Sequence, residues 1–257
     1  MGARPLLGFL SLVLLAGGVL LQFFVILAGT SNTKPLNLVY FLQTTTTGIN
    51  GARDPSRWTP FYICGVDSSG HNANCGKPVP ALPFNPPGKS NFDTDIGVPA
   101  AFIGTHKYFY LSRFAFAFLL ISMFFSVIAL FTGLLALCTR LGAYMSSLNT
   151  FLAAGFQVLF AALMTAWSVM GRDHFNADGQ TAKLGRYGYG FTWASVACFF
   201  ISTVLFCIGG STGRGRDYEA GRSRGGLFGR KRSTRSRHSQ RGSFLGSERS
   251  GIKDDYS

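Results

Sequence analysis

The sequence lacks charge over four long stretches. No Asp, Glu, Lys or Arg occurs in residues 5–33, 114–139, 141–171 or 187–213. A helix that crosses a bilayer needs about 20 mostly apolar residues, and one charge at its centre costs about 2.5–3.5 kcal/mol. Each stretch is long enough for such a helix, which argues against a water-soluble helical protein. The predicted fold class is an all-α membrane protein with a bundle of four transmembrane helices.

The sequence also lacks the signatures of catalysis and transport. It contains no HExxH, no Gly-x-Ser-x-Gly and no P-loop motif. Its four histidines are scattered over both loops outside the membrane and the tail, and the predicted spans carry none of the charged groups that transporters use. We therefore expect no enzyme activity, no cofactor and no metal site.

Acidic residues are scarce, and the basic surplus is local. The chain has 11 Asp and Glu against 24 Lys and Arg, and the tail after residue 210 holds 12 of those 24 cations. Basic segments next to a span stay in the cytosol. This bias places the C-terminus in the cytosol, and four spans then place the N-terminus there too. The charge thus indicates topology, and no nucleic-acid partner is expected.

The spans divide the chain into eight predicted segments. The first span should be an uncleaved signal anchor, because its apolar run of about 23 residues exceeds the 7–15 of a signal peptide. The segments are residues 1–29 (N-terminus and first span), 30–113 (first outer loop), 114–139 (second span), 140–147 (cytosolic loop), 148–171 (third span), 172–190 (second outer loop), 191–210 (fourth span) and 211–257 (cytosolic tail).

Two of the five cysteines lie in a predicted outer loop. Cys64 and Cys75 are the only two in the first outer loop, so they are predicted to form a disulfide packed under Trp58. Closing a loop of about 12 residues contributes roughly 3 kcal/mol by constraining the unfolded chain. Cys138 and Cys207 lie at the cytosolic ends of the second and fourth spans, where they are candidates for S-palmitoylation. Plain packing in the membrane is the alternative.

Two segments of the first outer loop are predicted strands of a small sheet. Residues 36–43 and 58–63 are rich in aromatic and β-branched residues and are bounded by turn formers. Six prolines follow, so the rest of the loop should be irregular. Aromatic residues that flank the spans predict an interfacial belt, formed by Phe102, Tyr108, Phe109, Tyr110, Trp167, Tyr187, Tyr189 and Trp193.

A few residues within the spans have predicted packing roles. Gln22 and Gln157 are the largest polar side chains there, and we expect each to hydrogen-bond between helices. Small residues four positions apart predict close helix packing or contacts between copies of the chain. These pairs are Ala129 with Gly133 and Ala162 with Ala166.

The tail, residues 211–257, is rich in Gly, Ser and Arg, and its few apolar residues predict disorder. One basic run is expected to bind anionic inner-leaflet lipids, each cation contributing about 1 kcal/mol, and phosphorylation within it would weaken this attraction. The alternative is a solvated tail that only fixes topology. The cations are Arg230, Lys231, Arg232 and Arg235, and the phosphorylation candidates are Ser233 and Thr234.

The first outer loop carries a recognisable pattern. Trp58, Cys64 and Cys75 form Trp-x5-Cys-x10-Cys, and the preceding segment contains Pro35-Leu36-Asn37 and Tyr40-Phe41-Leu42. With four spans, the pattern resembles the claudin-like fungal Sur-seven/PalI family of plasma-membrane tetraspanners, and its Sur-seven branch most. The Gly-Leu-Trp that precedes the first cysteine of animal claudins is absent, which argues against a junctional seal.

The resemblance implies a left-handed, claudin-like four-helix bundle under a small extracellular antiparallel β-sheet. It also implies a structural organiser in eisosomes that self-assembles laterally, sorts lipids and proteins, and affects endocytosis and cell-wall integrity. The implied partners are membrane lipids, among them sphingolipids or sterols, further copies of the chain, and eisosome proteins. The alternative function is a PalI-like accessory subunit of an external pH-sensing complex, and a small channel is a third class.

Overall fold

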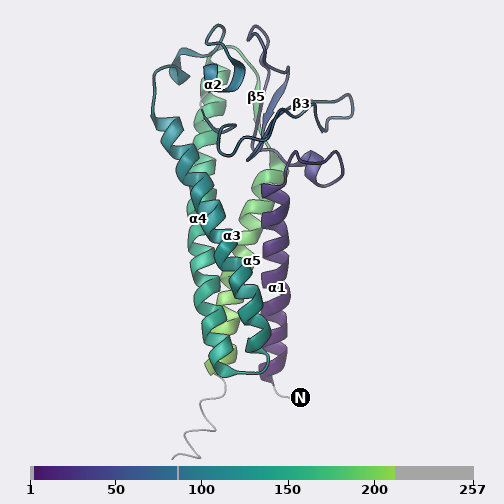
Figure 1. Cartoon of the computed structure of the whole chain (residues 1–257), viewed down its shortest axis with the longest axis vertical. Helices are drawn as coiled ribbons and strands as arrows, with labels where there is room; N and C mark the ends of the chain where they lie inside the picture. The colour runs from purple at the N-terminus through teal and green to yellow at the C-terminus, as the bar shows by residue number, and fades with distance from the viewer. Residues whose placement is uncertain (1–2, 86, 212–257) are drawn as a thin grey trace, which may run out of the picture. The chain divides into compact units, whose positions relative to one another are not determined.

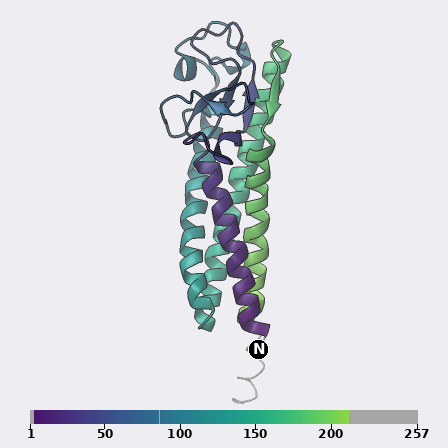
Figure 2. The ribbon, with the colours of Figure 1, turned by 90° about the vertical axis from the view of Figure 1, so that its right-hand side faces the viewer.

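The structure, a computed structural model, describes residues 3–85 and 87–211 and contains four long helices (Figure 1). All four are long and apolar enough to cross a membrane. They are α1 (Ala3–Ile26), α3 (Lys107–Ala136), α4 (Arg140–Ala177) and α5 (Arg186–Ser211). The helices lie side by side, and a small sheet covers the end of the bundle opposite the start of α1 (Figures 1 and 2). The predicted four-helix membrane fold is confirmed.

Helices α3 and α5 bury stripes made largely of small side chains. The buried positions follow at alternating steps of four and three residues, the 3.5-residue repeat of left-handed bundles. In α3 they are Tyr108, Ser112, Ala115, Leu119, Ser122, Ser126, Ala129 and Gly133. In α5 they include Gly188, Thr192, Ser195, Phe199, Ser202, Phe206 and Gly209. Large apolar side chains such as Phe124 and Phe131 are exposed on the outside, where lipid tails are equally apolar.

Gln22 of α1 and Gln157 of α4 meet in the centre of the bundle, and both are fully buried. Nε2 of Gln22 donates to Oε1 of Gln157 and to Oγ of Ser122, each at 2.7 Å. Oε1 of Gln22 accepts from Oγ of Ser126 at 2.8 Å, and Nε2 of Gln157 donates to Oγ of Ser195 at 2.9 Å. These five side chains form a polar network that joins all four helices. The expected interhelical role of both glutamines is confirmed.

The sheet has five antiparallel strands in the order β4-β3-β2-β1-β5. The strands are β1 (Leu42–Thr44), β2 (Ser56–Trp58), β3 (Ile63–Val66), β4 (Asn72–Ala73) and β5 (Ala182–Leu184). Because β5 comes from the loop between α4 and α5, the sheet combines both loops at this end of the bundle. Its register places Gln43 between Arg57 and Lys183. Three short helices complete the loops: η1 (Leu36–Leu38), α2 (Lys89–Phe92) and η2 (Ala100–Phe102).

The strands begin and end at residues other than those predicted. The first predicted strand, residues 36–43, starts instead with η1, where Nδ2 of Asn37 donates to the backbone O of Asn32 at 2.8 Å. The second predicted strand, residues 58–63, contains a turn. There the N–H of Tyr62 donates to Oγ1 of Thr59 at 3.0 Å, so the segment divides into the end of β2 and the start of β3.

Helix α4 extends beyond the predicted third span at both ends. It begins within the predicted cytosolic loop, residues 140–147, where Oγ1 of Thr139 caps it by accepting from the N–H of Gly142 at 3.0 Å. Its 38 residues cover about 57 Å, compared with about 30 Å for the hydrocarbon core of a bilayer. The uncharged stretch therefore predicts the apolar part of the helix but not the residues at which the helix begins and ends.

Aromatic side chains fill the junction between the sheet and the helices. Phe41, next to β1, packs edge-on against Phe84 and against Phe160 of α4, with ring centroids 6.2 Å and 6.1 Å apart. All three are fully buried. Phe84 lies in the proline-rich part of the first loop, which therefore folds over the helix ends and contributes to the core.

The predicted aromatic belt is wrong for three of its members. Phe102, Tyr108 and Trp167 are only 4%, 3% and 2% exposed. Phe102 of the first loop packs against Tyr108 of α3 and Phe175 of α4, and Phe84 of the same loop packs against Trp167. Tyr110 and Trp193 are exposed, as an interfacial belt requires.

Replacing Gln22 by Leu should destabilise the bundle by about 1–2 kcal/mol, because its partners on α3 and α4 lose a hydrogen bond away from water. Thermal unfolding of the full-length protein in detergent measures the loss. The control is Ser11→Ala, since Ser11 is also buried in α1 but donates only to the backbone O of Leu7 in its own helix, at 2.7 Å. Equal losses in the two variants would contradict a special role for the polar network.

Candidate functional site

Trp58 and the predicted disulfide lie on neighbouring strands. Cys64 on β3 is disulfide-bonded to Cys75, two residues beyond β4, so the bond closes this hairpin. The ring of Trp58 lies 6.1 Å from that of Phe92 and 6.0 Å from that of Phe175 on α4. Trp58 is fully buried and holds the sheet against α4, as a core residue of the loop should.

Arg57, which sequence reasoning missed, is a buried cation in the middle of the sheet, with 6% of its surface exposed. Its Nε donates to Oε1 of Gln43 at 2.9 Å, and its Nη1 donates to the backbone O of Gly70 and to Oδ1 of Asn72, both at 3.0 Å. Its Cζ lies 4.2 Å from the ring centre of Tyr40. The guanidinium is thus held in place by neutral groups.

Burial is the main influence on the charge of Arg57. It lowers the pKa of this guanidinium from its ordinary value, while Tyr40 and the carboxylate of Asp67 act in the opposite direction. Asp67 itself accepts hydrogen bonds from the backbone N–H groups of His71 and Ser69 at 2.7 Å and 2.9 Å, which lower its pKa. An arginine remains charged under these conditions, so the sheet contains a fixed positive charge.

Two glycines let the start of α5 approach the sheet. A Cβ at Gly185 or Gly188 would collide with the backbone carbonyl of Tyr40. The N–H of Gly185 donates to the backbone O of Phe41 at 3.0 Å, directly beside this contact. The absence of a side chain at these two positions is therefore what allows α5 to pack against the segment before β1.

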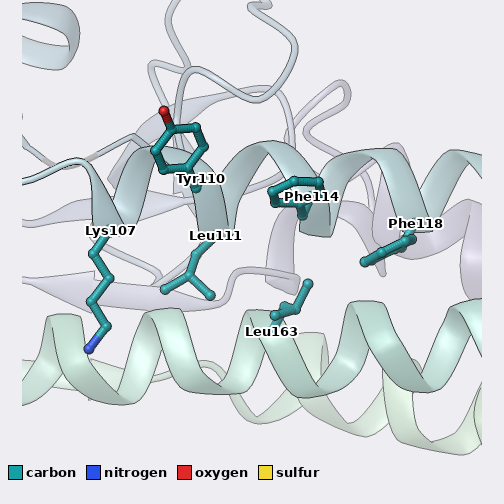
Figure 3. Close-up of a pocket in the computed structure, with 6 residues that line it drawn as sticks. All are labelled: Lys107, Tyr110, Leu111, Phe114, Phe118 and Leu163. Atoms are coloured by element: carbon teal, nitrogen blue, oxygen red, sulfur yellow. The ribbon is translucent and has the colours of Figure 1, made fainter.

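Near the sheet, α3 and α4 border an open apolar groove of about 460 Å³ (Figure 3). Leu111 points from α3 toward α4, and Leu163 points from α4 toward α3, while Lys107 extends from the start of α3 toward α4. The mostly apolar lining of the groove suits a lipid tail or an apolar helix. Its lining residues are Lys107, Tyr110, Leu111, Phe114, Phe118 and Leu163.

The two pairs of small residues face different ways. Ala129 and Gly133 are buried in the stripe of α3, where the backbone O of Ala129 accepts from Oγ of Ser146 on α4 at 3.1 Å. Ala162 and Ala166 are exposed on α4. The first pair therefore serves packing within the bundle, and the second leaves a shallow strip on its outside.

Of the free cysteines, Cys198 and Cys207 are both on α5, and Cys138 follows the end of α3. Cys138 is exposed between α3 and α4, and Cys207 is exposed on α5, where its Sγ lies 2.9 Å from Oγ of Ser147. The connection between α3 and α4 and the C-terminal end of α5 lie at the end of the bundle away from the sheet (Figure 1). Palmitoylation of Cys138 or Cys207 remains a prediction.

The tail residues predicted to bind lipid or to be phosphorylated lie outside the described residues. They are Arg230, Lys231, Arg232, Ser233, Thr234 and Arg235.

Within the described part of the chain, no three His, Cys, Asp or Glu side chains lie together in a group that could hold a metal ion. His71 lies 3.7 Å from the carboxylate of Asp67 in the turn between β3 and β4.

The geometry defines a class of protein: a multi-span membrane protein in which a disulfide-closed sheet from two loops is held on the end of a four-helix bundle. The model of the SUR7/PalI family matches residues 7–205, a range that contains the whole sheet and nearly all of the four long helices. The chain belongs to the SUR7/PalI family. The resemblance seen in the sequence is confirmed.

Several fungal proteins are similar over most of their length. Protein SUR7 of Candida albicans is 36% identical over 203 residues, which cover 78% of this chain and 73% of that protein. A SUR7 family protein of Saccharomyces cerevisiae is 35% identical over 201 residues, covering 77% of this chain and 64% of that protein, slightly under two thirds. A plasma membrane protein of the same yeast is 31% identical over 226 residues, covering 87% and 74%. These relatives and the four apolar helices support a multi-pass plasma-membrane protein.

Joint replacement of Cys64 and Cys75 by Ser should lower stability by about 3 kcal/mol, because a loop of about 12 residues is no longer closed in the unfolded chain. Thermal unfolding with and without reductant measures the loss. Reductant should bring the wild type to the level of the double variant and leave that variant unchanged. Cys138→Ser is the control, and it should respond to reductant as the wild type does. A wild type unaffected by complete reduction would refute this prediction.

Replacing Gly188 by Ala should lower the Tm of the full-length protein, because the new Cβ displaces the carbonyl of Tyr40. Gly190→Ala is the matched control on the same helix, since its Cβ meets no described atom within 4 Å. The control should be neutral or stabilised by about 0.5–1 kcal/mol, the helix preference of Ala over Gly. If Gly188→Ala were stabilising as well, the close contact between α5 and Tyr40 would be disproved.

Proposed function

We propose that this protein is a non-enzymatic organiser of fungal plasma-membrane domains of the eisosome type. It acts by lateral self-assembly and by sorting lipids and proteins, and it affects endocytosis and cell-wall integrity. One observation carries the proposal: the polar network buries both glutamines and three serines between the four helices, while large apolar side chains such as Phe124, Phe131 and Phe151 are exposed on the outside of the bundle. Such an apolar surface suits association in the plane of the membrane.

Two outward features support lateral contacts. The strip formed by Ala162 and Ala166 lets a second helix approach closely, as small residues four positions apart do in membranes. The groove beside it suits a lipid tail, a sterol or an apolar helix, because Phe114, Phe118 and Leu163 line it. Self-assembly and lipid sorting would then use adjacent surfaces of α3 and α4.

The proposed orientation places the sheet outside the cell and both termini in the cytosol. The disulfide between Cys64 and Cys75 supports this, because such bonds persist in oxidising compartments. In this orientation, Cys138 and Cys207 face the cytosolic side, and residues 230–235 of the tail meet the anionic inner leaflet. Eisosome proteins, sphingolipids and sterols are the proposed partners.

A signalling role of the PalI type is the second candidate function. Two of the relatives described above carry SUR7 names, which favours the organiser. A strain that lacks this protein would favour the signalling subunit instead if it lost the alkaline-pH response but kept the cortical patches formed by other membrane proteins. Ion conduction by the purified protein in a planar bilayer would point to a channel.

The double replacement Ala162→Leu with Ala166→Leu should weaken self-association, because the added side chains hold the second helix away. Fluorescently tagged full-length protein should form smaller or shorter-lived cortical patches, and photobleaching of single nanodiscs should count fewer copies. The control is Ala194→Leu with Ala197→Leu, which adds the same volume to exposed positions on α5. Patches and copy numbers that match the wild type in both double variants would refute association through this strip.

A further inference from the structure

A cavity of about 310 Å³ lies where the edge of the sheet meets the start of α5. Three of the residues that line it are cations, and each comes from a different element: Arg57 from β2, Lys183 from β5 and Arg186 from α5. Its other walls include Tyr40, Leu184 and Tyr187, and no acidic residue is among the lining residues. The cavity therefore combines positive charge with aromatic and apolar surface.

The charge of Arg57 is not balanced by a carboxylate at contact distance. Its hydrogen bonds go to two side-chain amides and one backbone carbonyl, and Nη2 donates to no atom in the described parts of the chain. Asp67 attracts Arg57 electrostatically, but its carboxylate serves the turn between β3 and β4. A buried guanidinium with only neutral partners gains most from an anion brought to it.

The other two cations are exposed and lie at the same opening. Lys183 and Arg57 flank Gln43 in the sheet register, so their side chains share one face. Arg186 is the first residue of α5 and donates from Nη2 to Oη of Tyr187 at 3.1 Å. The start of a helix adds its own partial positive charge to such a place.

A second cavity in the loops, of about 300 Å³, gives a useful comparison. It is lined by Arg53 and Lys77, but also by Asp93, so it contains both signs of charge. Of these two cavities, only the one at Arg57 is lined by cations without an acidic residue.

We propose that the cavity formed by Arg57, Lys183 and Arg186 binds a phosphate group. Phosphate carries up to two negative charges and several acceptor oxygens, which suits three cations that converge from three elements, and its geometry matches the fork of a guanidinium. The position at the start of the span of α5 and beside Tyr187 favours the phosphate of a lipid headgroup, with free phosphate as the other source. The site is independent of lateral assembly and goes beyond it.

Full-length protein in a maltoside detergent, in buffer without phosphate, tests the proposal. Dihexanoyl phosphatidic acid, inorganic phosphate and chloride are titrated at equal ionic strength, and the Tm and the apparent affinity are measured. A ligand that binds the folded state raises the Tm in a saturable way. We expect phosphatidic acid to do so, inorganic phosphate to do so more weakly, and chloride to have no saturable effect.

Variants separate binding from folding. Lys183→Gln should bind about tenfold more weakly, or about 1.4 kcal/mol, with an unchanged Tm in the absence of ligand, because Lys183 is exposed. Arg57→Gln should abolish the shift, and Arg53→Gln, which changes the comparison cavity, should retain it. Equal binding of inorganic phosphate and phosphatidic acid would assign the site to free phosphate. A chloride shift as large as the phosphate shift, or wild-type affinity in both Lys183→Gln and Arg57→Gln, would overturn the proposal.

Discussion

Apolar helices have no hydrophobic reason to associate inside a bilayer, so this bundle depends on hydrogen bonds formed away from water. Gln22 is central because it contacts two other helices directly and a third through Gln157. The small side chains of the buried stripes let the backbones come close enough for this. Oγ of Ser122, for example, also donates to the backbone O of Ala153 on α4 at 2.9 Å. The sheet rests on helix ends that this network has already fixed in relation to one another.

The parts of the fold that the sequence predicts are those with a large energetic penalty behind them. A charge within a bilayer is costly, so stretches without charge predict all four spans. A buried amide without a hydrogen bond is also costly, so Gln22 and Gln157 are predicted to hydrogen-bond between helices. The pairing of Cys64 with Cys75 followed from topology, because no other cysteine shares their loop. Helix ends and tilts carry smaller penalties, and α4 accordingly exceeded its predicted limits.

The remaining features depend on contacts between distant segments. Strand β5 has three residues, too few for a periodic pattern, and it is defined only by its pairing with β1. The lipid interface and a protein core are both favourable to Trp167, so composition could not distinguish them. The sequence does not distinguish Arg57 from other loop arginines, and only the sheet register shows that it and Lys183 flank Gln43. The cavity that these two residues share could not be inferred from either one alone.

Strand β5 is synthesised long after β1, the strand with which it pairs. Oγ1 of Thr45 accepts from the N–H of Thr181, 136 residues further on, so the edge of the sheet next to β1 stays open until α4 has been synthesised. At about 5–20 residues per second, this interval lasts on the order of ten seconds. During it, an unpaired strand edge faces other nascent chains and the quality-control machinery, and an identical copy could supply the missing strand. Biosynthesis therefore contains a defined window in which this fold is open to exchange between chains.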